Sequence, residues 1–217
     1  MKTNYLTRLF LLVIIAIIVS SCSQNEHNHD QTEEQDAKYI FYFIGDGMSN
    51  QHINLTEAYL KDANTDEIGF QKLAFDTLPF LGMITTYANN SLITGSAAAG
   101  TAMATGNKTN LKRISMSPDG KEKFESIAYK LKNQDKKIAI ISTVSIDHAT
   151  PAVFYANQEH RKQYFEIGKQ LSESGFDFFG GGGFVEPEKD SINLYSYTEK
   201  NNYHVLKNLE GIDEIKD

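Results

Sequence analysis

Apolar runs alternate with polar stretches along this chain, and the runs predict buried strands. The stretch 39–45 is continuous in β-branched and aromatic residues, and 137–143 repeats the pattern. Such runs are typical of strands buried on both faces. Shorter runs at 81–87 and 176–179 predict two further strands, and Tyr203–Leu206 begins like another.

Helical spacing fills the intervals between these runs. Ser49 is a good N-cap for a helix that ends near Lys61, and small residues after Ser96 predict a second helix. Apolar residues recur at helical spacing over 124–133, and 161–174 is also predicted to be helical.

Alternation of strands and helices predicts an α/β fold, with a mostly parallel central sheet and helices on both faces. In such sheets, functional sites gather beyond the carboxyl ends of the strands. Asp46, the turn before Ser96 and the segment after Thr143 all follow predicted strands. We therefore expect these three segments to meet at one edge.

The amino terminus has the pattern of an export signal. Lys2 and Arg8 precede an uncharged run over 9–19 that is too short to span a bilayer. Cys22, the only cysteine, follows it in a context that resembles the bacterial lipoprotein signal. The alternatives are an uncleaved anchor, or a secretory signal with an incidental cysteine.

The lipoprotein reading divides the chain into three parts. It predicts a signal peptide over 1–21, an acidic tether over 22–37 that starts with acylated Cys22, and a folded domain over 38–217. The mature protein is then exported and lipid-anchored to a bacterial membrane, facing the periplasm or the cell surface.

The negative net charge of the chain bears on which kinds of molecule it can bind. The formal charge is −7, and removal of residues 1–21 makes it more negative because two basic residues are lost. Nucleic-acid binding needs clustered Lys and Arg, which this sequence lacks, so we expect no nucleic-acid partner. A small phosphorylated substrate remains compatible, since metal ions can reverse the local field.

Three segments contain candidate chemistry, and each has an ordinary alternative. Ser96 precedes small residues at a predicted helix start, where unpaired N–H groups suit a phosphate; the alternative is tight packing. Asp46 lies between two glycines and can bridge hard cations, or is a turn residue. Thr150 offers a hydroxyl, with Pro151 placed to start a helix. The guanidinium of Arg161 can donate to two phosphate oxygens at once; the alternative is that Arg161 forms an ion pair on the surface.

Taken together, these segments resemble the alkaline phosphatase family. The resemblance spans about Tyr39 to Gly183, and it rests on the order and spacing of three motifs: Gly45-Asp46-Gly47-Met48; Thr94-Gly95-Ser96-Ala97-Ala98; and His148-Ala149-Thr150-Pro151-Ala152 with Arg161.

The resemblance implies an alkaline phosphatase-like α/β/α sandwich that hydrolyses small phosphate monoesters at alkaline pH through a phosphoserine. Ser96 would be the nucleophile and Arg161 the phosphate clamp. Asp46 would be shared between Zn²⁺ and Mg²⁺, with Thr150 and the His148 position at the magnesium. Two zinc ions and one magnesium ion are implied, and a homodimer is allowed.

One position and one absence depart from the family, and a second position varies within it. Gly95 stands where the family usually has an aspartate that orients the clamp arginine, so we expect Arg161 to be more mobile. His148 stands where members carry either aspartate or histidine. The further family ligands, including an Asp-x-x-x-His pair, are missing, because none of the six histidines has an aspartate four positions earlier.

We therefore expect the chain to resemble the amino-terminal part of a phosphatase and to hold only part of the site, without turnover by itself. Two alternatives remain open. One is a non-catalytic surface lipoprotein with the phosphatase fold. The other is a related metal-dependent hydrolase of sulfate esters or phosphodiesters.

Overall fold

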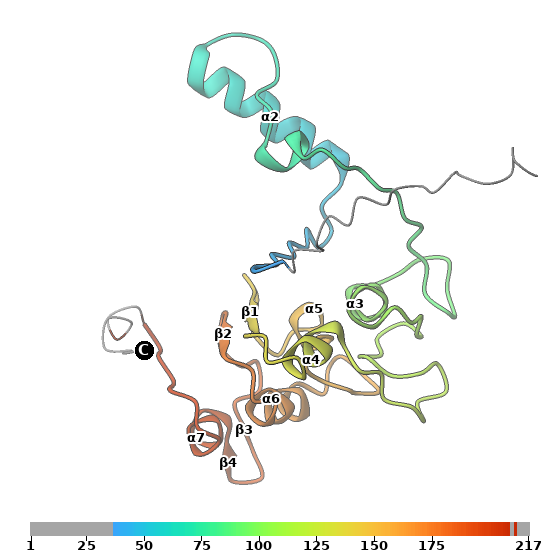
Figure 1. The fold of residues 1–217 in the computed structure, drawn as a ribbon, viewed down its shortest axis with the longest axis vertical. Helices are drawn as coiled ribbons and strands as arrows, with labels where there is room; N and C mark the ends of the chain where they lie inside the picture. The colour runs from blue at the N-terminus through green and yellow to red at the C-terminus, as the bar shows by residue number, and fades with distance from the viewer. Residues whose placement is uncertain (1–36, 209–210, 212–217) are drawn as a thin grey trace, which may run out of the picture. The chain divides into compact units, whose positions relative to one another are not determined.

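The computed structural model describes residues 37–208 and residue 211 (Figure 1). The chain divides into two compact units, with the boundary between Ile44 and Gly45. All the helices and strands of the described residues lie in the second unit. The predicted domain boundaries at 21 and 37 lie at or outside the edge of the described part and stay predictions.

Helix α2 (Asn50–Thr65) opens the second unit. Its N-cap is Ser49, as predicted, and the Ser49 backbone N–H donates to Nδ1 of His52 at 3.1 Å. The helix continues past the predicted end at Lys61 and stops at Asp66, whose φ of 54° is left-handed. Its N-terminal boundary was therefore legible in the sequence, and its C-terminal boundary was not.

The strands predicted at 39–45 and 81–87 are wrong. Neither stretch forms a ladder with any described residue, and their side chains are largely exposed, with Phe43 at 88% and Leu81 at 97%. An apolar β-branched run favours a strand only where another strand is available to pair with it. Between α2 and 81–87 the chain forms only the short 3₁₀ helix η1 (Ala74–Thr77).

Helix α3 (Ser96–Thr105) begins at the predicted serine and packs against α5 (Ala149–Ala152) and α4 (Ile127–Lys132). Most of its buried residues are alanine or glycine. A Cβ placed on Gly100 would lie 3.1 Å from Cγ2 of the fully buried Val153, just after α5. Small residues on α3 therefore let the two helices approach closely.

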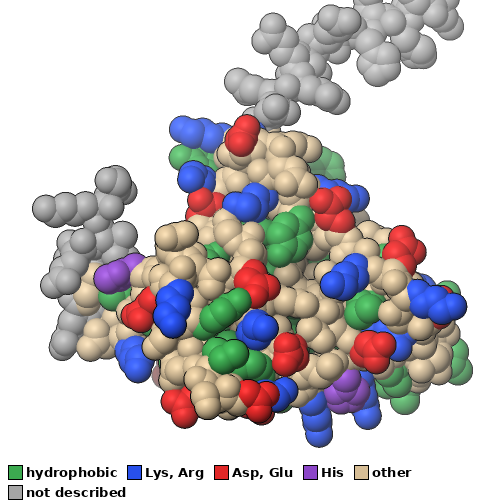
Figure 2. Space-filling model, turned by 90° about the horizontal axis from the view of Figure 1, so that it is seen from below, with side chains coloured by type: hydrophobic (Ala, Val, Ile, Leu, Met, Phe, Trp, Pro, Cys, Tyr) green, Lys and Arg blue, Asp and Glu red, His purple; other side chains and the backbone are tan. Residues whose placement is uncertain are grey.

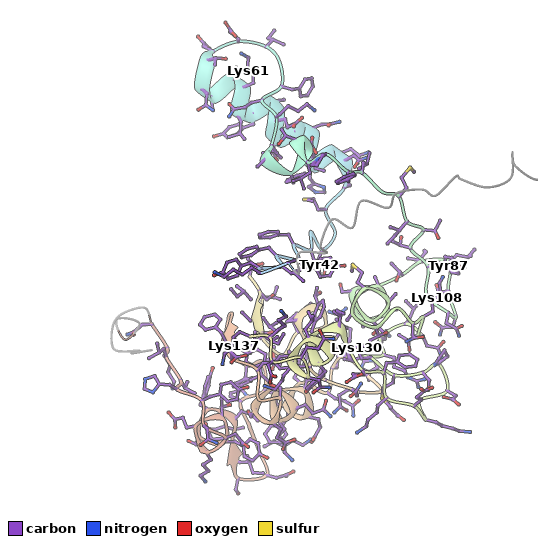
Figure 3. All side chains as sticks on the ribbon, in the orientation of Figure 1. Tyr42, Lys61, Tyr87, Lys108, Lys130 and Lys137 are labelled. Atoms are coloured by element: carbon purple, nitrogen blue, oxygen red, sulfur yellow. The ribbon has the colours of Figure 1, made fainter. Side chains whose placement is uncertain are left out.

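The segments that flank α3 are joined to one another. Lys108 and Tyr87, both labelled in Figure 3, lie together, with Lys108 Nζ donating to the Tyr87 carbonyl at 3.2 Å. The amide of Asn89 donates to Asn110 Oδ1 at 2.9 Å, and the Leu111 N–H donates to a side chain of the same turn. These contacts hold the segment before the helix against the segment after it.

A parallel pair of strands, β1 (Ala139–Ile141) and β2 (Phe178–Gly180), confirms the α/β class. Ala139 pairs with Phe178, and Ile141 pairs with Gly180. Asp177 fixes this register, because one carboxylate oxygen accepts the Ile138 N–H at 2.9 Å and the other accepts Lys137 Nζ at 2.9 Å. Both strands lie within or one residue beyond their predicted ranges, but they are shorter.

The carboxyl-terminal part contains a helix that the sequence did not predict. The small hairpin of β3 (Glu188–Lys189) and β4 (Ile192–Asn193) leads into α7 (Leu194–Lys200), which packs against α6 (Tyr164–Glu173) (Figure 1). Oδ1 of Asn193 caps α7 by accepting the Tyr195 N–H at 3.0 Å.

Tyr203–Leu206, predicted to begin a strand, forms no strand. Tyr203 instead joins an aromatic cluster, with its ring centroid 5.9 Å from that of Phe179, which in turn lies 5.4 Å from Tyr155 and 6.0 Å from Phe176. Tyr129 completes the cluster at 4.8 Å from Phe176. The cluster connects α4, β2 and the segment after α5.

Charged side chains of both signs are interspersed on the face that Figure 2 shows. Within residues 37–208 and residue 211, no helix has the length and apolar character needed to cross a bilayer.

Candidate active site

Ser96 is the first residue of α3, and its hydroxyl meets the carboxylate of Asp46. Gly95 is the N-cap in extended backbone, and its carbonyl accepts the Ala99 N–H at 3.0 Å. Ser96 Oγ donates to Asp46 Oδ1 at 3.1 Å. The sequence therefore correctly placed this hydroxyl at a helix start, beside the unpaired N–H groups of the first turn.

Asp46 lies in a tight turn in which the Met48 N–H donates to the Gly45 carbonyl at 3.2 Å. Gly47 in that turn has a φ of 72°, a left-handed conformation that glycine adopts without strain. The second carboxylate oxygen, Oδ2, accepts Thr150 Oγ1 at 2.7 Å. One carboxylate thus joins two hydroxyls, from residues that lie 50 and 104 positions after Asp46 in the sequence.

The pKa of Asp46 is lowered below its ordinary 3.8. The hydrogen bond from Thr150 is the largest cause, and the bond from Ser96 and the positive charge of Arg161 act in the same direction, against a rise caused by burial. Asp46 is therefore an anion at neutral pH, suited to hold hydroxyl protons or a cation.

Thr150 owes its position to α5, which starts at Ala149 rather than at Pro151. His148 is the N-cap, and its carbonyl accepts the Ala152 N–H at 2.9 Å. Pro151 occupies the first turn of the helix, where a missing N–H removes no bond. The hydroxyl of Thr150 then points to Asp46.

His148 and Arg161 form a pair next to the group of Asp46, Ser96 and Thr150. Arg161 Nη2 lies 2.9 Å from His148 Nε2, while Nδ1 of the imidazole is buried and has no hydrogen-bond partner among the described residues. Burial lowers the pKa of His148, the Arg161 charge lowers it further, and Asp46 and Asp147 oppose the shift. The imidazole is therefore favoured in its neutral form.

The three residues joined at Asp46 and the pair of His148 and Arg161 together include all five residues predicted for the site. Asp46 bonds to Ser96 and Thr150, His148 bonds to Arg161, and Thr150 follows His148 by two residues. A model of the family described as alkaline phosphatase matches residues 37–177. The chain belongs to the alkaline phosphatase family.

Curated alkaline phosphatases match most or all of the chain. Alkaline phosphatase 4 of Bacillus subtilis is 28% identical over 228 aligned positions, which cover 100% of this chain and 49% of the relative. The human tissue-nonspecific isozyme is 28% identical over 208 positions, which cover 83% of this chain and 40% of the relative. The chain therefore spans about half the length of the curated relatives it matches.

Solved alkaline phosphatases share the fold. A cold-active alkaline phosphatase from Shewanella has a TM-score of 0.68 at 29% identity and covers 79% of this chain and 42% of its own. The Thermus thermophilus enzyme has a TM-score of 0.63 at 29% identity, covering 73% and 34%. These likenesses confirm the predicted alkaline phosphatase-like fold.

A third solved structure concerns metals. A variant of the alkaline phosphatase from the Antarctic bacterium TAB5, in which a histidine is replaced by aspartate, has Mg bound in a site named M3. Its TM-score is 0.59 at 26% identity, covering 72% of this chain and 46% of that one. Metal dependence is thus supported for the family.

The donor atoms of the site fit magnesium better than zinc. Asp46, Ser96 and Thr150 offer the oxygen atoms that Mg²⁺ prefers. A catalytic zinc usually has three protein ligands, and the described part of the chain contains no group of three or more His, Cys, Asp or Glu able to hold a metal. The described residues therefore do not make a zinc site.

Asp147 was not predicted to be part of the site, although it lies next to His148. It is fully buried, and Oδ2 accepts the Val185 N–H at 2.8 Å. Burial raises the pKa of Asp147, against the lowering effect of that bond. In the loop between β1 and Asp147, the Val144 carbonyl accepts the Gly182 N–H at 2.8 Å, and the Ile146 N–H donates to the Gly183 carbonyl at 2.9 Å. In the sequence, the run of glycines over 180–183 is the one signal of this close packing.

Cys22 lies outside the described residues, so its lipidation stays a prediction.

Proposed function

We propose that this chain contributes the phosphate-accepting part of a phosphate-monoester hydrolase that works at alkaline pH. The observation that supports the proposal is the Asp46 carboxylate joined to the Ser96 and Thr150 hydroxyls, with Arg161 beside them. A nucleophilic hydroxyl, a helix N-terminus and a guanidinium are together suited to a phosphoryl group.

In the proposed reaction, Ser96 Oγ gives up its proton and attacks phosphorus while the bond to the ester oxygen breaks, and the leaving oxygen takes up one proton to become the alcohol. Water then attacks the phosphoserine, the bond to Ser96 Oγ breaks, and phosphate leaves. Asp46 orients the hydroxyl through the 3.1 Å bond. Arg161 and the first N–H groups of α3 hold the non-bridging oxygens as charge moves among them.

Divalent cations, when bound, supply Lewis-acid activation of the hydroxyl and neutralise the phosphate. Asp46 and Thr150 would hold magnesium. The full set of two zinc ions and one magnesium ion stays a prediction of the family resemblance, and no step is assigned to zinc because the described residues do not make its site.

A phosphate titration tests the proposed site. The full chain, supplied with Mg²⁺ and Zn²⁺, is titrated with inorganic phosphate by calorimetry. We expect Arg161→Ala to weaken binding by about tenfold or more, because it removes charged hydrogen bonds. Lys162→Ala is the matched control, since it removes an exposed neighbouring charge. Equal affinities of Arg161→Ala and the parent chain would contradict the site.

Turnover distinguishes an enzyme from the second candidate, a non-catalytic phosphatase-fold lipoprotein. The absence of a three-ligand zinc set among the described residues favours that candidate for the chain by itself. We expect no hydrolysis of a chromogenic phosphate monoester by the 217-residue chain. Hydrolysis that Ser96→Ala abolishes would show that the chain is sufficient for catalysis.

We also propose export and lipid anchoring through Cys22, and the family allows a homodimer. Radiolabelled fatty acid should enter the parent chain in a bacterial host and should not enter Cys22→Ser. Labelling of both forms would reject Cys22 as the acceptor. Sedimentation of the purified chain would give the oligomeric state.

A further inference from the structure

The contact between Arg161 and His148 fixes which atom carries the imidazole proton. A guanidinium has five N–H donors, no acceptor, and stays charged in proteins. The 2.9 Å contact therefore has Arg161 Nη2 donating to the lone pair of His148 Nε2. The ring hydrogen of neutral His148 must then be on Nδ1.

We propose that His148 is the positioning residue for the Arg161 guanidinium, and that it orients this guanidinium for a tetrahedral oxyanion. The proposal rests on the proposed phosphate site. The hydrogen-bond acceptor of the Arg161 guanidinium is an imidazole nitrogen rather than a carboxylate oxygen. Position 95, just before the nucleophile, is a glycine with no side chain to offer an acceptor.

Both partners of the contact are anchored through their backbones. The His148 N–H donates to the Ser145 carbonyl at 3.0 Å, and the Arg161 N–H donates to the Lys112 carbonyl at 2.7 Å. Asp147, the residue before His148, is buried, and its carboxylate accepts the Val185 N–H. A fixed acceptor restricts the long arginine side chain before any ligand binds, which reduces the ordering cost of binding.

The contact with His148 leaves the positive charge of Arg161 and most of its N–H donors available to bind phosphate. It uses one of five N–H donors, and a neutral acceptor does not cancel the guanidinium charge as a carboxylate would. An imidazole nitrogen has one lone pair, so Nε2 cannot hold a cation while it accepts from Arg161. In this contact the Nε2 lone pair of His148 is therefore used by Arg161.

Phosphate affinity tests the assignment through matched variants of the full chain. His148→Ala should weaken the binding of inorganic phosphate by about tenfold, as expected for loss of a charged hydrogen bond. His148→Gln places an amide oxygen near the position of Nε2 and should retain most of the affinity. Gly95→Asp in the His148→Ala background should restore affinity by supplying a new acceptor. His204→Ala, an exposed histidine, is the control.

Three outcomes would overturn the assignment. The first is unchanged affinity in His148→Ala. The second is equal loss in the alanine and glutamine variants without recovery by Gly95→Asp, which indicates a merely structural role. The third is a phosphate affinity of the parent chain too weak to measure, which overturns the proposed function and with it the role of the contact.

The tautomer of His148 is a readout that needs no phosphate. Long-range ¹H–¹⁵N correlation of the ring in the full chain should show the hydrogen on Nδ1. A hydrogen on Nε2 would overturn the contact itself, whatever the phosphate data show. Failure of the positioning role and failure of the proposed function are therefore distinguishable.

Discussion

Replacing Gly100 with alanine should destabilise the fold through one defined contact. The new Cβ would lie 3.1 and 3.2 Å from the two γ-methyl groups of Val153, which has no exposed surface and little room to move. Overpacking of this kind costs about 1–3 kcal/mol. Alanine regains about 1 kcal/mol of helix propensity over glycine. The expected net loss in free energy of unfolding is about 0–2 kcal/mol.

A double-mutant cycle isolates the contact from the propensity effect. Val153→Ala removes both γ-methyl groups, at a cost of about 2 kcal/mol for two buried carbons and the cavity they leave. In that background Gly100→Ala no longer meets Val153, so it should stabilise by about 1 kcal/mol. The coupling between the two sites is then about 1–3 kcal/mol.

Urea unfolding of the four proteins, followed by far-ultraviolet circular dichroism, gives the cycle. A clash requires Gly100→Ala to have different effects in the two backgrounds. If the substitution stabilises the parent chain and Val153→Ala equally, α3 and α5 are not in the close contact described, and the explanation for the small residues of α3 fails.

Two further substitutions test other parts of the support. Burial tends to raise the pKa of Asp177, but hydrogen bonds from Lys137 and the Ile138 N–H outweigh it, and the net pKa is lowered. Its stabilising effect is present above the unfolded pKa of about 3.9 and is lost as pH falls through the lower folded value. Asp177→Asn should cost about 1–2 kcal/mol at pH 7, with the difference narrowing toward about pH 3 in urea unfolding. Tyr155→Phe leaves the Ile146 carbonyl without the phenol that donates to it, and should cost about 1–3 kcal/mol by the same assay.

Matched variants control both of these substitutions. Lys137 is largely exposed, so Lys137→Gln should cost less than about 1 kcal/mol. An equal loss in Lys137→Gln and Asp177→Asn would show that the bond to Ile138 does not matter. Tyr129→Phe removes a phenol that is less buried than that of Tyr155, and should cost less. A larger loss in Tyr129→Phe would refute the importance assigned to the Tyr155 bond.

Local signals in the sequence predicted the elements that depend on local chemistry. Ser49 starts α2 and Ser96 starts α3, because capping and small residues act within one turn. Pairing is not local, and the runs 39–45 and 81–87 show why their prediction failed: apolar character does not supply a partner strand. Helix α7 was missed because it is short, and its Asn193 cap was the available signal.

The site divides in the same way. Asp46, Ser96 and Thr150 were expected at one edge because each follows a predicted strand, and they do meet, although neither the run before Asp46 nor the run before Ser96 forms a strand. The pairing of His148 with Arg161 was not predicted, since it depends on how the loop between them folds back. Burial of Asp147 was also not predicted, because it arises from packing against the loop around Val185.

The alanine-rich face of α3 has a thermodynamic consequence beyond its shape. Ordering alanine and glycine side chains loses no rotamer entropy, so this helix is fixed against α5 without the loss that longer side chains would incur. Few apolar atoms are buried in return, and the helix depends on its neighbours to stay closed. We therefore expect the amides of α3 and of the α5 segment to exchange with solvent as one cooperative unit, so that the serine and the threonine that share Asp46 are exposed and protected together.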